Sequence, residues 1–141
     1  MKRGRSNPAP FFFLSRRAIR FAAMIKRLDK LEVATADLAD ASSIYEKNFG
    51  FSVTRSEDGK SASMKVGGAE IHLVTGATID SSNEGMIGLW LEAEDVDQVV
   101  ANFHMAGLDA GGIEIVSGRR ILTIDPKFAN QVPLFIFDRK A

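Results

Sequence analysis

The hydrophobic and polar positions of this chain follow two alternating periods. From Leu28 the period is two, with Leu31 and Val33 on one side and Lys30 and Glu32 on the other. Alternation of this kind is typical of a strand that packs one face into a core. The pattern therefore predicts a first strand whose second face is charged.

The period changes after Asp37. Asp37 is a good helix cap, and Gly50 supplies a left-handed exit. Between them, apolar residues recur at three- and four-residue spacing, as in an amphipathic helix: Leu38, Ala41, Ile44, Tyr45 and Phe49. We expect this helix to lay its apolar stripe on the Leu31/Val33 side of the first strand.

Three further strands are predicted before the polar stretch that begins at Thr75. The segment SVTRSEDGKSASMKV has the pattern of a hairpin around Asp58-Gly59, and Gly67-Gly68 turns the chain into a strand from Glu70 to Val74. The segment TGATIDSSNE, residues 75–84, is small and polar and is the best linker candidate.

The second half repeats the first at an offset of about 58 residues. A strand is predicted from Gly88 to Ala93, and Asp95 takes the part of Asp37 as a helix cap. The helix that follows buries Val96, Val99, Val100 and Phe103 and ends at Gly107-Leu108. Strands are then predicted over residues 112–116, 119–124 and 132–137.

The repeat predicts an α+β fold of two βαβββ modules, about residues 27–75 and 86–139. Each module is too small to close a core alone, so we expect them to form one domain, residues 27–141, with curled mixed sheets around a shared cleft. Residues 1–26 are interpreted as a basic N-terminal extension, disordered or a loose helix. It is a dispensable extension, a targeting peptide or a partner contact.

Charge and composition narrow the function classes. There is no cysteine, which excludes disulfides and thiolate chemistry. The first 23 residues hold 6 of the 18 basic residues and no acid, which leaves 12 basic against 18 acidic residues in the body. An acidic body argues against nucleic acid as a partner. The apolar runs are too short to span a membrane, so we expect a cytoplasmic protein.

Four stretches resemble the vicinal oxygen chelate superfamily, which includes glyoxalases, bleomycin-resistance proteins and extradiol dioxygenases. They are LDKLEVATADLADASSIYEKNFGF, AEIHLV, IGLWLEAEDVDQVVANFHMAGL and DPKFANQVPLFIF. The resemblance covers nearly everything after Met24, and it implies paired βαβββ modules and a homodimer.

The resemblance also implies where a divalent metal would be held. Enzymes of the family use one side chain from each of four strands, and the matching positions here are Lys30, His72, Gly88 and Phe135. Only His72 has a suitable donor, because a lysine ammonium has no lone pair and glycine and phenylalanine offer no donor atom. We therefore expect neither a metal site nor another cofactor.

Parity of the strands places a set of polar and aromatic side chains on the cleft wall. The candidate catalytic residues are His72, Glu32 and Glu70, since imidazole beside a carboxylate suits proton transfer near neutral pH. Lys30 with Glu32, and Glu70 with His72, are candidate local pairs. The candidate ligand-binding residues are Lys30, Trp90, Glu92, Phe135 and Phe137, of which the aromatic ones suit a flat or apolar molecule.

Three functions remain open at this point. The first is a metal-free cleft that binds a small, partly apolar ligand. The second is a metal-free enzyme of isomerase or lyase type that uses His72 and a carboxylate, with Lys30 stabilising an anion. The third is a structural or interaction module whose cleft is filled by Trp90, Phe135 and Met86. The pair Arg119-Arg120 is a candidate anion contact near the rim, whereas His104 is expected in solvent.

Overall fold

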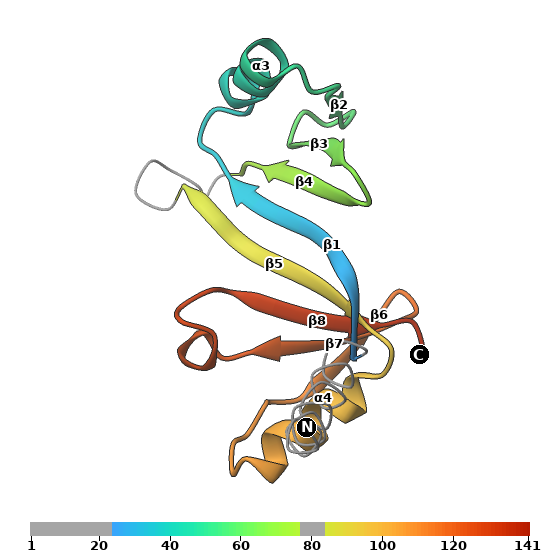
Figure 1. Ribbon diagram of the computed structural model, residues 1–141. Coiled ribbons are helices and arrows are strands. Elements are labelled where there is room, and N and C mark those ends of the chain that lie inside the picture. Colours follow the sequence, from blue (N-terminus) through green and yellow to red (C-terminus); the bar gives the residue numbers. More distant parts are fainter. Residues whose placement is uncertain (1–23, 77–83) are drawn as a thin grey trace, which may run out of the picture.

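The computed structural model describes residues 24–76 and 84–141, and in these ranges the chain forms one mixed eight-stranded sheet with two α-helices and one short 3-10 helix, Pro126–Phe128. Two long strands lie in the middle of the sheet, and one α-helix lies toward each end of it (Figure 1). The strand order is β2-β3-β4-β1-β5-β8-β7-β6. The strands of the first module are β1 (Ile25–Ala34), β2 (Thr54–Arg55), β3 (Ser61–Val66) and β4 (Ala69–Val74). Those of the second are β5 (Gly85–Ala93), β6 (Ile113–Val116), β7 (Arg119–Ile124) and β8 (Leu134–Asp138).

The two modules are joined along β1 and β5, which pair antiparallel. On the outer side of each, the closing strand of the same module runs parallel, β4 beside β1 and β8 beside β5. The predicted α+β fold of two βαβββ modules is confirmed. The two sheets expected from the repeat are one continuous sheet, because the first strands of the modules bond to each other.

The first strand begins earlier than the alternation indicates. β1 starts at Ile25, within the segment assigned to the extension, and Met24 accepts a backbone hydrogen bond from Glu94. Residues 1–23, and most of the predicted linker, lie outside the described residues.

Helix α3 (Leu38–Phe49) begins and ends at the predicted residues. The Asp37 carboxylate accepts from the backbone N–H of Asp40 at 3.0 Å, which satisfies one of the unpaired donors of the first turn. Gly50 has a φ of 75° and its N–H bonds back to Glu46. Only glycine adopts this left-handed exit without strain.

The buried side of α3 differs from the predicted stripe. Leu38, Ala41 and Tyr45 pack on the core of Ala62, Met64 and Leu73, as expected. Ile44 and Phe49, however, are 44% and 66% exposed, while Ser42 is fully buried. The buried side of the helix is therefore centred on Leu38, Ala41, Ser42 and Tyr45, and Ile44 and Phe49 lie toward solvent.

Helix α4 (Val96–Met105) repeats the design in the second module. The Asp95 carboxylate accepts from the N–H of Asp97 at 2.9 Å. Val96 and Val99 are buried in a core with Leu122, Ile124 and Ile136 from β7 and β8. Gly107 follows the helix end with a φ of 76°, as the aspartate-to-glycine spacing predicts.

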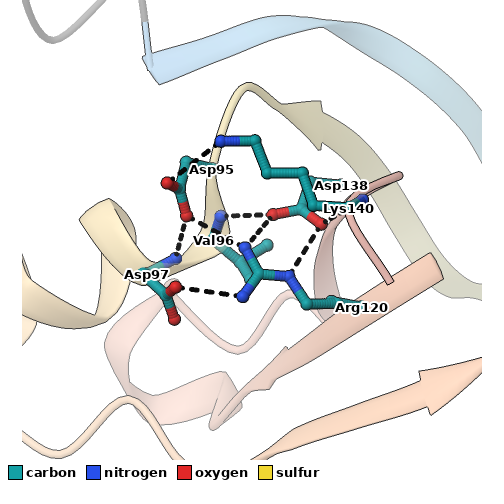
Figure 2. Close-up of polar contacts among 6 residues, drawn as sticks. All are labelled: Asp95, Val96, Asp97, Arg120, Asp138 and Lys140. Carbon is teal, nitrogen blue, oxygen red and sulfur yellow. Dashed lines mark hydrogen bonds and ion pairs between the residues drawn. The ribbon is translucent and has the colours of Figure 1, made fainter.

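An ion-pair cluster fixes the start of α4 to the sheet (Figure 2). Arg120 donates to both oxygens of Asp138, at 3.0 and 2.6 Å, and also reaches Asp95 and Asp97, each at 3.0 Å. The Val96 N–H donates to Asp138 at 2.8 Å. Asp138 is only 1% exposed, so these hydrogen bonds, rather than water, stabilise its negative charge.

The helices of the described residues include none that is long and apolar enough to cross a membrane.

Candidate functional site

One face of the central sheet carries the candidate site residues. On β1 and β4, Val33 and Ile71 pack toward α3. Because successive side chains on a strand point to opposite faces, their neighbours project from the face away from the helices. The same alternation holds on β5 and β8, where Leu91 and Ile136 pack in the α4 core. We call this surface the site face; it carries Lys30, Glu32, His72, Gly88, Trp90 and Phe135.

The antiparallel pairing of β1 and β5 decides which of these residues meet. Lys30 lies opposite Trp90, and Glu32 lies opposite Gly88. Parallel pairing adds His72 beside Glu32 and Phe135 beside Trp90. The four positions that the family resemblance identified therefore do lie together at the junction of the modules.

Glu32 is the polar centre of the site face. The Trp90 indole N–H donates to Glu32 Oε1 at 2.6 Å. The other carboxylate oxygen lies 3.5 Å from Nδ1 of His72. That nitrogen is buried and has no hydrogen-bond partner among the described residues. A buried ring nitrogen without a hydrogen bond is unusual in a folded protein, and the acceptor closest to hydrogen-bonding distance here is Glu32.

Aromatic and cationic side chains lie next to this carboxylate. Trp90 and Phe135 stack with their ring centres 4.5 Å apart and their planes 15° apart. The Lys30 Nζ lies over the Trp90 ring at 5.0 Å from its centre, a cation–π contact. Among the described residues Lys30 has no carboxylate within 4.0 Å. The expected ion pair of Lys30 with Glu32 is therefore absent from this part of the chain.

Gly88 is a glycine because its side-chain space is occupied. A Cβ at this position would lie 3.0 Å from Glu32 Oε1, 3.0 Å from Trp90 Nε1 and 3.1 Å from Phe135 Cε2. These contacts are tighter than ordinary van der Waals distance. The side chains of Glu32, Trp90 and Phe135 thus occupy the volume that a metal-binding side chain at position 88 would need.

The donor set does not fit a divalent metal ion. At the four family positions only His72 has a donor, and Glu32 is the one neighbour that adds oxygen. Nowhere in residues 24–76 and 84–141 do three or more His, Asp or Glu side chains gather as metal ligands. Protein sites for zinc or magnesium use more than two donor groups. The residues present here therefore do not fit a divalent metal ion.

Glu92 and Phe137 continue the site face along β5 and β8, and both are covered. The Glu92 oxygens accept from Arg27 at 3.0 Å and from Arg139 at 3.2 Å, with Lys26 at 3.9 Å. Burial raises the pKa of Glu92, but its hydrogen bond to Arg27 and the nearby cations more than offset this and lower the pKa. Phe137 is fully buried, with its ring centre 6.2 Å from that of Trp90.

The side chains of the remaining candidates form no ion pair with this cluster in the described residues. Glu70 pairs across the strands with Lys30 and Lys65, and it forms no ion pair with His72 in the described chain. Met86 is 41% exposed on β5. His104 is exposed on α4, as expected.

Two parts of the arrangement had no clear signal in the sequence. The cations that surround Glu92 come from β1 and from the chain after β8, and local patterning does not pair such distant segments. The role of Gly88 is equally hidden, since a glycine near a strand start is ordinarily assigned to a turn.

Comparison with known families supports the architecture. Residues 27–129 match the family model described as the Glyoxalase/Bleomycin resistance protein/Dioxygenase superfamily. No curated protein matches the sequence.

Solved structures with the same fold include methylmalonyl-CoA epimerases. The enzyme from Mycobacterium tuberculosis is 21% identical with a TM-score of 0.60, and the match covers 82% of this chain and 89% of that one. A Streptomyces coelicolor enzyme, in complex with 2-nitronate-propionyl-CoA, is 20% identical with a TM-score of 0.59, over 83% and 99% of the two chains. A hypothetical protein from Bacillus halodurans C-125 is 12% identical with a TM-score of 0.58, over 82% and 95%. At these identities the likeness concerns the fold.

Proposed function

This chain belongs to the Glyoxalase/Bleomycin resistance protein/Dioxygenase superfamily, and we propose that it binds a small, partly apolar organic anion on the site face without a metal ion. The observation that carries the proposal is the position of Lys30. Its ammonium lies over Trp90 and forms no ion pair within the described residues, although Glu70 is its neighbour on β4. A carboxylate on a ligand would supply the missing counter-charge.

The aromatic pair supports the apolar part of the ligand. Trp90 and Phe135 are both partly exposed on the site face, and their stacked rings present apolar edges beside Lys30. Sites for small molecules commonly combine such apolar surface with a few placed polar groups. The similar proteins include epimerases in complex with CoA esters, which makes acyl thioesters a natural class to test.

The test is a binding survey with native protein and one charge variant. Small 2-oxo acids, thiohemiacetals and acyl-CoA esters are screened by thermal shift, and hits are titrated by calorimetry. Lys30→Gln is expected to weaken binding roughly tenfold or more, because it removes a charge-assisted hydrogen bond. Lys47→Gln, in the last turn of α3, is the matched control and keeps native affinity. Equal affinity for native protein and Lys30→Gln would refute the proposal.

A second function is favoured by the contact between Glu32 and His72. One Glu32 oxygen is held by Trp90, and the other faces the unpartnered His72 Nδ1. Such a pair can move a proton to or from a carbon next to a carbonyl, a step of isomerase type. Lys30 would then stabilise the anion that forms.

Hydrogen–deuterium exchange separates binder from enzyme. A bound 2-oxo acid or acyl thioester is followed by NMR in D₂O for loss of the signal next to the carbonyl. Loss that stops in His72→Ala and in Glu32→Gln supports the proton-transfer function. Ligand binding without exchange above the protein-free rate restricts the chain to binding.

The remaining function is an interaction module in which Trp90 and Phe135 only fill the site face. That function predicts no hit in the survey. The expected homodimer is tested separately by sedimentation equilibrium across a concentration series, and the cytoplasmic location by imaging of a tagged full-length chain.

A further inference from the structure

Two arginines lie at the end of the site face away from His72. The guanidinium carbon of Arg119 is 4.6 Å from the ring centre of Phe137, and that of Arg139 is 5.5 Å from the same point. Phe137 is fully buried beneath these contacts. The two cations therefore share one aromatic support.

The strand register places these arginines opposite each other. Arg120 pairs with Asp138 and Ile121 with Phe137 along the antiparallel strands β7 and β8. Continuing the register by one residue brings Arg119 across from Arg139. Like charges directly opposite each other destabilise a sheet. Glu92 pairs with Arg139 at 3.2 Å, so the repulsion is compensated on the Arg139 side alone.

Among the described residues, one carboxylate pairs with Arg139 and none pairs with Arg119. Glu92 is shared by Lys26, Arg27 and Arg139, the last through Nε alone. Within the described residues, the Arg119 side chain donates no hydrogen bond, and neither do the two terminal nitrogens of Arg139. Two guanidinium groups with unused donors thus face one region. This concentration of cations occurs in a body with 12 basic and 18 acidic residues.

We propose that Arg119 and Arg139 bind a phosphate group, the anionic end of a phosphorylated ligand whose apolar part lies on Trp90 and Phe135. Guanidinium groups bind phosphate oxygens in paired hydrogen bonds, and a dianion neutralises two opposed cations where a carboxylate neutralises one. Phe137 connects the two regions, since its ring lies 6.2 Å from Trp90 and 4.6 Å from the Arg119 guanidinium. The aromatic half of this inference rests on the proposed function; the arginine half does not.

Inorganic pyrophosphate tests the arginine pair by itself. Calorimetry with the full chain at fixed ionic strength is expected to show saturable binding. Arg119→Gln weakens it roughly tenfold or more, since each charge-assisted bond contributes about 1.5 kcal/mol or more. Arg55→Gln, whose native arginine pairs with Glu46, is the matched control and keeps native affinity. Absence of saturable binding, or equal affinity in Arg119→Gln, overturns the proposal.

A second measurement does not depend on any ligand. Without anions that bind, Arg119→Gln is expected to melt close to the native temperature, because the relieved repulsion with Arg139 offsets the lost contact with Phe137 and Arg119 forms no ion pair within the described residues. A clear drop in melting temperature would show that Arg119 is structural and would overturn the proposal.

Phenyl phosphate tests the connection to the aromatic residues. Its affinity is expected to fall in both Arg119→Gln and Phe135→Leu, whereas pyrophosphate affinity falls only in the former. Loss confined to Arg119→Gln for both probes supports the phosphate site and refutes its link to the proposed ligand. Binding of phenyl phosphate that needs Phe135 but not Arg119 supports the proposed function and refutes the phosphate site.

Discussion

The ion-pair cluster at the start of α4 yields a quantitative prediction. Burial raises the pKa of Asp138, but the hydrogen bonds from Arg120 and from the Val96 and Lys140 N–H groups more than offset this and lower it to about 2. Against an ordinary value of 3.8, this shift corresponds to about 2 kcal/mol of folding free energy.

The sign of the effect follows from the direction of the shift. A carboxyl whose pKa is lowered on folding stabilises the native state at every pH above its ordinary value. That contribution is complete near pH 5 and above, and it decreases as the pH falls from about 4 toward about 2. Below the folded-state pKa, Asp138 is neutral in both states and contributes nothing through its charge.

Asp138→Asn is the perturbation that isolates this carboxylate. We expect the variant to lose about 2 to 4 kcal/mol at pH 7, because Arg120 loses its buried charged partner, to which it makes its shortest contact, and the helix N-terminus loses a charged acceptor. Urea denaturation at several pH values between 7 and 3 is the assay. The deficit relative to native protein should narrow below pH 4.

Asp97→Asn is the matched control for Asp138→Asn. Asp97 contacts the same Arg120 at 3.0 Å, but its side chain is 65% exposed. Solvent screens such a pair, so the expected loss is under about 1 kcal/mol. Equal losses in the two variants, or a deficit for Asp138→Asn that stays constant from pH 7 to pH 3, would refute the argument that a buried, hydrogen-bonded carboxylate carries the effect.

Three further predictions concern the site face. Gly88→Ala is expected to destabilise the fold by about 1 to 3 kcal/mol, because its Cβ would press on Glu32, Trp90 and Phe135; an unchanged urea midpoint would contradict this. Glu32→Leu should cost about 1 to 3 kcal/mol and change Trp90 fluorescence by leaving the indole N–H without its acceptor, while Glu32→Gln, which keeps an acceptor, should cost less. Zinc or magnesium chloride should leave the melting temperature unchanged, and saturable stabilisation at one equivalent would refute the assignment of the donor set.

The local elements of this fold could be predicted from sequence because their causes are local. Asp37 and Asp95 cap helices through side-chain contacts with residues two or three positions later, and Gly50 ends a helix through its own φ. The orientation of α3 could not be predicted in the same way. Its apolar spacing includes Ile44 and Phe49, yet the side chain that fits beneath the helix is Ser42, and that choice depends on the shape of the sheet.

In the candidate site, too, the chemistry of each residue was predictable from sequence and its contact partners were not. The sequence alone determined that Lys30, Gly88 and Phe135 bring no metal donor to the family positions, because donor chemistry belongs to the residue type. It also placed Glu32, His72 and Trp90 on one face through the period of two. Only the tertiary structure decided that Trp90 bonds to Glu32 and that Lys30 lies over Trp90.

The physical reason is strand register. The pairing of β1 with β5 joins residues far apart in the sequence, and the hydrogen bond of Trp90 to Glu32 spans 58 positions. The same holds for Arg119 and Arg139, which meet only because β7 and β8 pair with Arg120 opposite Asp138. A shift of one residue would turn each side chain to the other face. Residue type and local period therefore came from the sequence, whereas the partner of each charged or aromatic side chain came from the packing of the two modules into one sheet.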